Sequence, residues 1–198
     1  MFGLRCLLAA FVLAIAACGS GSPRFSGTDV TGAEFGKDFR LLDQNGVERT
    51  LADFRGKAVA LFFGYTHCPD VCPTTLATMR EAMQQLGDDR SRLQVIFITV
   101  DPQRDTAELL GRYVTAFDPS FLGLRGDAQA TERTAREFKV LVSRHAGTKP
   151  DNYSVDHSTG IYLFDPEGRL RVYLSHSQGA DVLAHDVREL LRTSGAPS

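Results

Sequence analysis

The chain has 198 residues, of which 43% are hydrophobic and 23% are charged, a composition close to that of an average soluble protein. This length favours a single domain with enough chain to bury a substantial core. The formal net charge is −2 and no run of Lys or Arg forms a basic stripe, which argues against nucleic acid as a partner.

The first 22 residues carry one charge, at Arg5, and an apolar run follows it over residues 6–17. This run is too short to cross a bilayer, which needs roughly 20 helical residues, but it suits the apolar region of a secretory signal peptide. It ends in Ile15-Ala-Ala-Cys18, which resembles the bacterial lipobox, where cleavage leaves a lipidated cysteine as the first residue. We therefore predict a lipoprotein signal peptide over 1–17 and a lipid on Cys18. An ordinary signal peptide cut near Ala17 is the alternative.

The Gly, Ser and Pro residues after Cys18 predict a flexible tether over 18–30, with the folded domain over 31–195. A lipid on Cys18 would hold this domain at a membrane of the bacterial cell envelope, on the periplasmic side. Cys6 leaves with the signal peptide, so the folded part keeps two cysteines, Cys68 and Cys72. Disulfides can persist in that compartment, so the pair is a bridge, a redox pair or a pair of metal ligands.

The first half of the domain predicts a hairpin and then a strand–helix–strand unit. The hairpin turns at Asn45-Gly46, a pair typical of tight hairpin turns. Two continuous apolar runs have the character of strands buried on both faces, and the helix between them has apolar residues at spacings of three and four. The elements are a hairpin over 39–51, a short helical turn or loop over 53–57, strands over 58–65 and 93–100, and a helix over 74–86.

The second half predicts more helices and a second hairpin. The elements are helices over 105–117, 127–138 and 182–191, a short edge strand over 121–124, a strand over 139–144 and a hairpin over 160–174. A β-α-β-α unit followed by a terminal hairpin and helix is the thioredoxin layout, here with an inserted helix and strand before the hairpin. The predicted fold class is therefore α/β, thioredoxin-like, with a central mixed sheet flanked by helices and an N-terminal hairpin.

The two cysteines lie in His67-Cys-Pro-Asp-Val-Cys-Pro73, between the end of a buried strand and the start of a helix. Ligands of open α/β sheets bind at this edge, and a helix N-terminus favours thiolates. Residues four apart on a helix share a face, with Cα atoms roughly 6 Å apart. Such a pair can close a disulfide or bind one ion, so position and spacing allow both redox and metal chemistry.

A purely structural disulfide is the simplest interpretation, but it would close a loop of a few residues and stabilise the fold little. Two thiolates suit a soft ion, and copper(I) is the one that they select most readily in an exported protein. Structural zinc normally takes four protein ligands, and this pair supplies two. The missing ligand should be neutral. His157, in a polar loop over 151–158, is the leading candidate, with Asp156 beside it to orient the ring or tune its basicity.

The other histidines have weaker claims to the site. His67 adjoins Cys68 and is a candidate auxiliary ligand. His145, His176 and His185 occur in loop or helix contexts without a partner cluster, so we expect solvated surface residues.

Three blocks of the sequence together resemble the Sco (SenC) family. They are Phe63-Gly-Tyr-Thr-His-Cys-Pro-Asp-Val-Cys-Pro73, Val100-Asp-Pro-Gln-Arg-Asp105 and Tyr153-Ser-Val-Asp-His-Ser158. The resemblance covers roughly residues 30–193. A C-x-x-x-C pair alone would be weak evidence, whereas three blocks in order are highly specific.

The resemblance implies a thioredoxin-like fold that binds copper, Cu(I) or Cu(II), through Cys68, Cys72 and His157. It also implies delivery of copper to the binuclear CuA centre of cytochrome c oxidase subunit II, so the partners would be the apo subunit or other copper chaperones. Asp101 and Arg104 match the second block, and we expect them to shape the loop near the site. Many relatives use an N-terminal transmembrane helix as anchor, where this chain is expected to use a lipid.

Two functions compete for this site. A metallochaperone passes its ion to a target by ligand exchange, whereas a thiol–disulfide reductase keeps the target's cysteines reduced, with Cys68 attacking and Cys72 resolving the mixed disulfide. A peroxidase is a weaker alternative, because both cysteines fall in one short motif. His157 separates the first two functions, since a dithiol reductase has no need of a distant imidazole.

Overall fold

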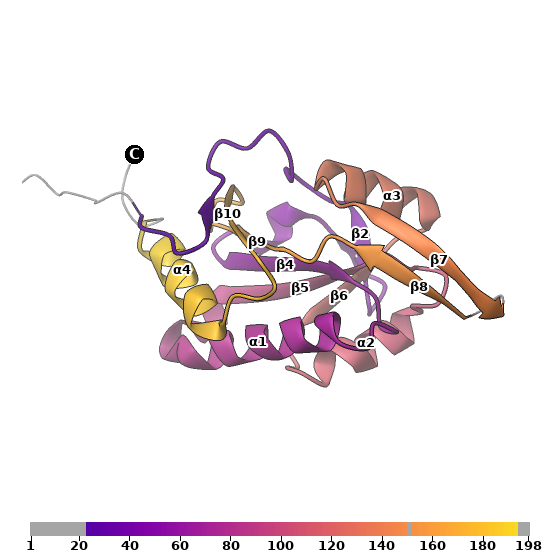
Figure 1. The fold of residues 1–198 in the computed structure, drawn as a ribbon. Coiled ribbons are helices and arrows are strands. Elements are labelled where there is room, and N and C mark those ends of the chain that lie inside the picture. The colour runs from indigo at the N-terminus through magenta and orange to yellow at the C-terminus, as the bar shows by residue number, and fades with distance from the viewer. Residues whose placement is uncertain (1–22, 150–151, 194–198) are drawn as a thin grey trace, which may run out of the picture.

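An eight-stranded mixed sheet forms the centre of the computed structural model, which describes residues 23–149 and 152–193 (Figure 1). Its strands are β1 (Thr28–Asp29), β2 (Leu41–Asp43), β3 (Glu48–Arg49), β4 (Ala58–Gly64), β5 (Leu93–Thr99), β6 (Leu122–Arg125), β9 (Ile161–Phe164) and β10 (Leu170–Leu174). They follow the order β1-β10-β9-β4-β5-β6-β2-β3, with β4, β5 and β6 parallel and the other pairs antiparallel. The mixed sheet expected from the sequence is confirmed.

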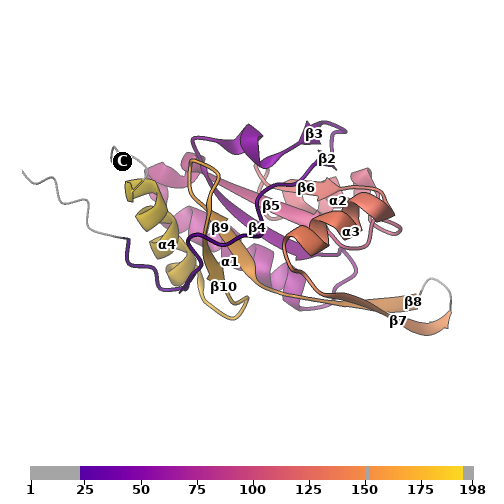
Figure 2. The same cartoon turned by 90° about the horizontal axis from the view of Figure 1, so that it is seen from above.

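The two central strands, β4 and β5, are buried along their whole length because helices cover both faces of the sheet. The helices are α1 (Val71–Gln85), α2 (Ala107–Thr115), α3 (Ala128–Glu137) and α4 (Ala180–Thr193), with 3₁₀ turns η1 (Leu51–Phe54) and η2 (Gly87–Arg92). The apolar sides of α1, α2 and α4 pack on one face, while α3 and η1 pack on the other (Figures 1 and 2). The helices over 105–117, 127–138 and 182–191 are confirmed with ends shifted by one or two residues. Asp127 caps α3 by accepting from the Ala130 N–H.

A separate two-stranded hairpin projects from one end of the molecule (Figures 1 and 2). It consists of β7 (Val142–Lys149) and β8 (Asn152–His157), antiparallel, with Val142 opposite His157. The prediction of a polar loop over 151–158 is therefore wrong, because most of this segment forms strand β8. The side chains of residues 142–147 are exposed, so this part of β7 lies outside the core, and the hairpin's sequence lacks the apolar pattern that marks the buried strands.

Strand β6 lies inside the sheet and not at its edge. It pairs with β5 on one side and with β2 on the other, where Leu42 is opposite Arg125. The edge strand predicted over 121–124 is therefore wrong. The N-terminal hairpin, formed by β2 and β3 as predicted, returns to cover β6, and no local pattern in the sequence announces that long-range pairing.

The folded domain includes residues before position 31, where it was predicted to begin. The backbone N–H groups of Ser26 and Gly27 donate to the buried carboxylate of Asp186 at 2.7 and 2.8 Å, and β1 pairs with β10. The prediction of a flexible tether over 18–30 is therefore wrong for its second half, which contacts the folded domain. The predicted signal peptide, Cys18 and the start of the tether lie outside the described residues. Among the residues that the structure describes, no helix is both long and apolar enough to cross a bilayer.

Candidate metal site

The cysteine pair occupies the junction between β4 and α1, at the carboxyl end of a central parallel strand. The Cys68 N–H donates to the Tyr65 carbonyl at 3.2 Å and closes a turn before the helix. Helix α1 begins at Val71, three residues before the predicted start, so Cys72 lies in its first turn. Pro73 is compatible with this position because the first-turn N–H groups have no partner within the helix.

Both thiols are free and they differ in exposure. Cys72 is completely buried, whereas Cys68 is half-buried. The Cys72 N–H points at the Cys68 sulfur over 3.5 Å. Burial raises the pKa of the Cys72 thiol, so it stays protonated at neutral pH unless a positive partner replaces its proton. A bound metal ion is such a partner.

The absence of a side chain at Gly64 makes room for the Cys72 thiol. A Cβ at this last residue of β4 would lie 2.7 Å from the Cys72 sulfur and 2.6 Å from the Phe97 ring. Both distances are far shorter than van der Waals contact. Glycine here therefore lets the thiol settle directly on the end of the strand.

The imidazole of His157 contacts the buried thiol of Cys72. Its Nε2 lies 3.6 Å from the Cys72 sulfur, although the residues are 85 positions apart. The Ser158 carbonyl lies 2.9 Å from Nδ1, and because a carbonyl can only accept, it assigns the proton to Nδ1 and leaves a lone pair on Nε2. The ring meets those of Phe62 and Tyr65 edge-on at 6.0 Å. Burial lowers the pKa of His157 and keeps the ring neutral near pH 7.

The comparisons with known proteins decide the family. Residues 28–192 match the family model described as SCO1/SenC. The chain belongs to the SCO1/SenC family. It is 42% identical over 153 residues to the bovine protein SCO2 homolog, mitochondrial, an alignment that covers 76% of this chain and 58% of that protein. The chain therefore spans less than two thirds of the length of this relative.

Solved structures of Sco proteins share the fold. The structure of Bradyrhizobium japonicum ScoI with copper bound is 36% identical, covers 78% of this chain and 98% of its own, and superposes with a TM-score of 0.72. The apo Sco1 protein of Thermus thermophilus is 38% identical, with 84% and 96% coverage and a TM-score of 0.75. The family and the thioredoxin-like fold expected from the sequence are confirmed.

In this SCO1/SenC chain the three predicted ligands are not equally assembled. The structure brings the Cys72 thiol and the His157 imidazole into contact, while Cys68 lies in the loop before α1. Metal bonds of about 2.3 Å to sulfur and about 2.0 Å to nitrogen, the lengths that zinc shows, allow one ion to join atoms 3.6 Å apart. No cluster of three or more His, Cys, Asp or Glu side chains in the described part of the chain is already arranged to hold a metal. A three-ligand site therefore needs Cys68, Cys72 and His157 to come closer together than they lie here.

The role of orienting the ring, predicted for Asp156, belongs to Ser158. Successive side chains of a strand point to opposite faces, so Asp156 points away from the site. Its carboxylate pairs instead with Nε2 of His145 on the neighbouring strand, at 2.8 Å.

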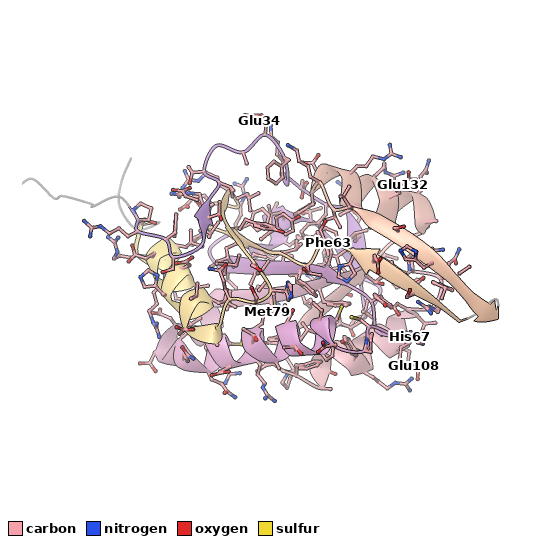
Figure 3. The ribbon with its side chains drawn as sticks, viewed as in Figure 1. Glu34, Phe63, His67, Met79, Glu108 and Glu132 are labelled. Atoms are coloured by element: carbon pink, nitrogen blue, oxygen red, sulfur yellow. The ribbon has the colours of Figure 1, made fainter. Side chains whose placement is uncertain are left out.

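The remaining histidines of the SCO1/SenC chain have oxygen partners. His67 hydrogen-bonds the Thr66 hydroxyl at 3.1 Å and is half-exposed, and Figure 3 shows it at the surface beside the start of α1. His176 contacts the Thr159 hydroxyl at 2.8 Å, and His185 contacts a carboxylate oxygen of Asp186 at 2.9 Å.

Asp105, which is not among the predicted site residues, fixes the loop that carries the cysteines. Its buried carboxylate accepts from the Thr66 N–H at 3.1 Å, from the Thr66 hydroxyl at 2.6 Å and from the Thr99 hydroxyl at 2.5 Å. These bonds tie the loop after β4 to the end of β5. The available signal was an Asp at the end of the second family block, which begins where a buried strand ends.

Asp101 and Arg104 fix the strand that carries His157. Asp101 is completely buried, accepts from the Tyr153 hydroxyl at 2.6 Å and pairs with Arg104. Arg104 also donates to the Tyr153 carbonyl at 2.9 Å and stacks 3.6 Å from the centre of that ring. These contacts agree with the expectation that Asp101 and Arg104 shape the surroundings of the site. We call these three residues the Asp101 clasp.

Proposed function

We propose that this SCO1/SenC protein binds copper through Cys68, Cys72 and His157 and delivers it to the CuA centre of cytochrome c oxidase subunit II. The observation that carries the proposal is the 3.6 Å approach of the His157 Nε2 lone pair to the buried Cys72 sulfur. Two sulfurs and a neutral imidazole are ligands that suit copper(I). The structure of the B. japonicum relative is described with copper bound, which supports copper as the metal.

The difference in exposure between the two cysteines suits an ion that must leave again. Cys68 is half-buried and Cys72 is fully buried, so an incoming ligand from a target would reach copper from the Cys68 side. The Cys72 thiol gives up its proton to solvent as copper binds and takes one back as copper leaves. Three protein ligands leave room for a fourth donor from the target during ligand exchange.

The proposal includes an anchored location. A lipid on Cys18 would attach the domain to a membrane of the bacterial cell envelope, with the domain on the periplasmic side. The first described residues lie beside α4, at the end of the molecule opposite the β7–β8 hairpin (Figures 1 and 2). An N-terminal anchor would therefore leave the metal site and the hairpin free to meet a target.

The same exposure difference supports a second candidate function, a thiol–disulfide reductase acting on the target's cysteines. The Cys68 thiolate would attack a target disulfide and release one target thiolate. Cys72 would then attack the mixed disulfide, which frees the second target thiol and leaves a Cys68–Cys72 disulfide. One target disulfide is reduced for each dithiol oxidised.

An anaerobic Cu(I) competition titration tests the metal site. The soluble chain would begin at residue 23, so that it keeps the contacts of Ser26 and Gly27 with Asp186. We expect one copper per chain. We also expect Cys68→Ser, Cys72→Ser and His157→Ala each to weaken binding at least about 100-fold, or about 2.8 kcal/mol. Unchanged affinity in His157→Ala would show that the three-ligand site is wrong, and stoichiometry well below one copper would reject the chaperone.

Reductase activity and copper affinity, measured side by side in His157→Ala, separate the two functions. If the His157 imidazole serves copper binding, His157→Ala should lower the copper affinity and leave the reduction potential of the Cys68–Cys72 pair nearly unchanged. A reductase that binds no copper would keep its activity in His157→Ala.

A further inference from the structure

An exposed apolar pair lies beside the metal site. The side chains of Leu141 and Val142 are 79% and 40% exposed, and they are two of the four large hydrophobic residues that are exposed in the described part of the chain. Isolated exposed apolar residues are ordinary, whereas contiguous exposed apolar surface marks an interaction site. The Leu141 carbonyl accepts from the Ser158 N–H, and the Leu141 N–H donates to the Ser158 hydroxyl, both at 3.1 Å. The pair is therefore fixed next to His157.

Two neighbouring hollows share this pair. One is lined by Leu141 and Val142 together with His157 itself. The other has a volume of about 390 Å³, runs between α3 and the start of β7, and has apolar walls that include Ala135 and Val140. We call this second hollow the α3–β7 groove. Because the two hollows share Leu141 and Val142, the α3–β7 groove adjoins the hollow that His157 lines.

A buried hydroxyl in the groove has no partner. Thr131 is 8% exposed, it lines the groove, and its Oγ1 makes no hydrogen bond in the structure. Thr134, one turn later on the same helix, shows the usual alternative, since its hydroxyl donates to the Ala130 carbonyl at 2.9 Å. Buried polar groups are normally paired, so this unpaired hydroxyl sets Thr131 apart from Thr134 in the wall of the groove.

The charged residues around the α3–β7 groove favour an acidic occupant. Arg136 and Arg144 line it together with one carboxylate, Glu132, which pairs with Arg136. The Arg144 side chain remains 41% exposed, and its nearest carboxylate, Asp101 at 3.4 Å, already pairs with Arg104. Two cations against one exposed carboxylate leave a positive rim.

We infer that the α3–β7 groove docks a segment of the apo CuA domain of oxidase subunit II. The segment places an apolar side chain against Leu141 and a neighbouring carboxylate toward Arg144. This inference rests on the proposed function, which supplies the partner. The groove adjoins the hairpin, at the end of the molecule away from the first described residues (Figure 1), where an anchored domain would meet its target.

Binding of the apo CuA domain of the same organism to the mature, detergent-solubilised protein tests the inference. Isothermal titration calorimetry measures the Kd for wild type and for Leu141→Ser, whose exposed side chain contributes little to the core. Leu42→Ser, 44% exposed on β2, is the matched control. We expect Leu141→Ser to weaken binding at least tenfold and Leu42→Ser to leave it unchanged.

The Cu(I) affinity of each variant, measured separately, distinguishes this inference from the proposed function. Leu141→Ser should bind copper as wild type does. Equal Kd values for wild type and Leu141→Ser, or no binding of the CuA domain by wild type, would overturn the docking inference. So would a dimer that Leu141→Ser dissociates, because the surface would then serve a second copy. If wild type binds the domain through Leu141 but takes up no copper, the docking surface stands and the proposed copper function fails.

Discussion

The hydroxyl of Tyr153 donates a 2.6 Å hydrogen bond to the buried carboxylate of Asp101. Tyr153 lies on β8, four residues before His157, and Asp101 lies just after β5. The bond therefore joins the projecting hairpin to the central sheet. Val155 of β8 is buried, whereas Ser154 and Asp156 on either side of it are exposed. Polar contacts therefore help to position this strand and the imidazole at its end.

Loss of the Tyr153 hydroxyl should weaken copper binding although Tyr153 is not a ligand. In Tyr153→Phe the ring still stacks on Arg104, but one acceptor site of Asp101 becomes empty and β8 is held less firmly. We expect about a tenfold loss of Cu(I) affinity, or about 1.4 kcal/mol, in a competition titration. Tyr173→Phe on β10 is the control, and we expect it to bind copper normally. Equal affinity in Tyr153→Phe and wild type would mean that the clasp does not position His157.

The parts of the fold that the sequence predicted are those with local signals. The continuous apolar runs of β4 and β5 and the periodic apolar residues of the helices mark a buried sheet between helices. The hairpin of β7 and β8 carries polar residues on both strands, and β1 has two residues, so neither has a pattern to detect. Their pairing depends on contacts between distant segments, as does the position of β6 inside the sheet.

The candidate site divides in the same way. The place of the cysteine pair between a buried strand and a helix points to the site directly, whereas only the family resemblance distinguishes His157 from the other four histidines. Gly64, Asp105 and Tyr153 were not singled out, because each acts through a partner far along the chain. The Thr66–Asp105 contact, for example, spans 39 positions.

Gly64→Ala should damage both the fold and the site. The new Cβ would lie 2.7 Å from the Cys72 sulfur, so Cys72 and Phe97 must shift in a tightly packed region. We expect a loss of about 1–3 kcal/mol in the free energy of unfolding, measured by urea denaturation, together with weaker copper binding. Gly111→Ala in α2 is the matched control, because its Cβ would meet only the flexible Gln44 side chain, at 3.3 Å. A stable Gly64→Ala protein with normal copper affinity would contradict the proposed packing.

The buried imidazole of His157 should make the apoprotein less stable as the pH falls. Burial lowers the pKa of His157 below its ordinary value of about 6.5, so in acid the unfolded chain binds a proton there more readily than the folded chain does. This contribution to stability is therefore complete above pH 6.5 and is lost as the pH falls through the lowered pKa. We expect urea denaturation from pH 7.5 to 5 to show a smaller decline in His157→Gln than in wild type. A decline in His157→Gln as large as that in wild type would refute the effect.

The buried thiol of Cys72 should react much more slowly than that of Cys68. Cys72 is fully buried and its pKa is raised, so both access and the thiolate fraction are low at pH 7.5. We expect iodoacetamide to label Cys68 at least about ten times faster in the reduced, metal-free protein, as followed by mass spectrometry of the peptides. Urea should remove the difference, since the unfolded chain exposes both thiols. Equal rates in the folded protein would place Cys72 at the surface and remove the basis for assigning attack to Cys68 and resolution to Cys72.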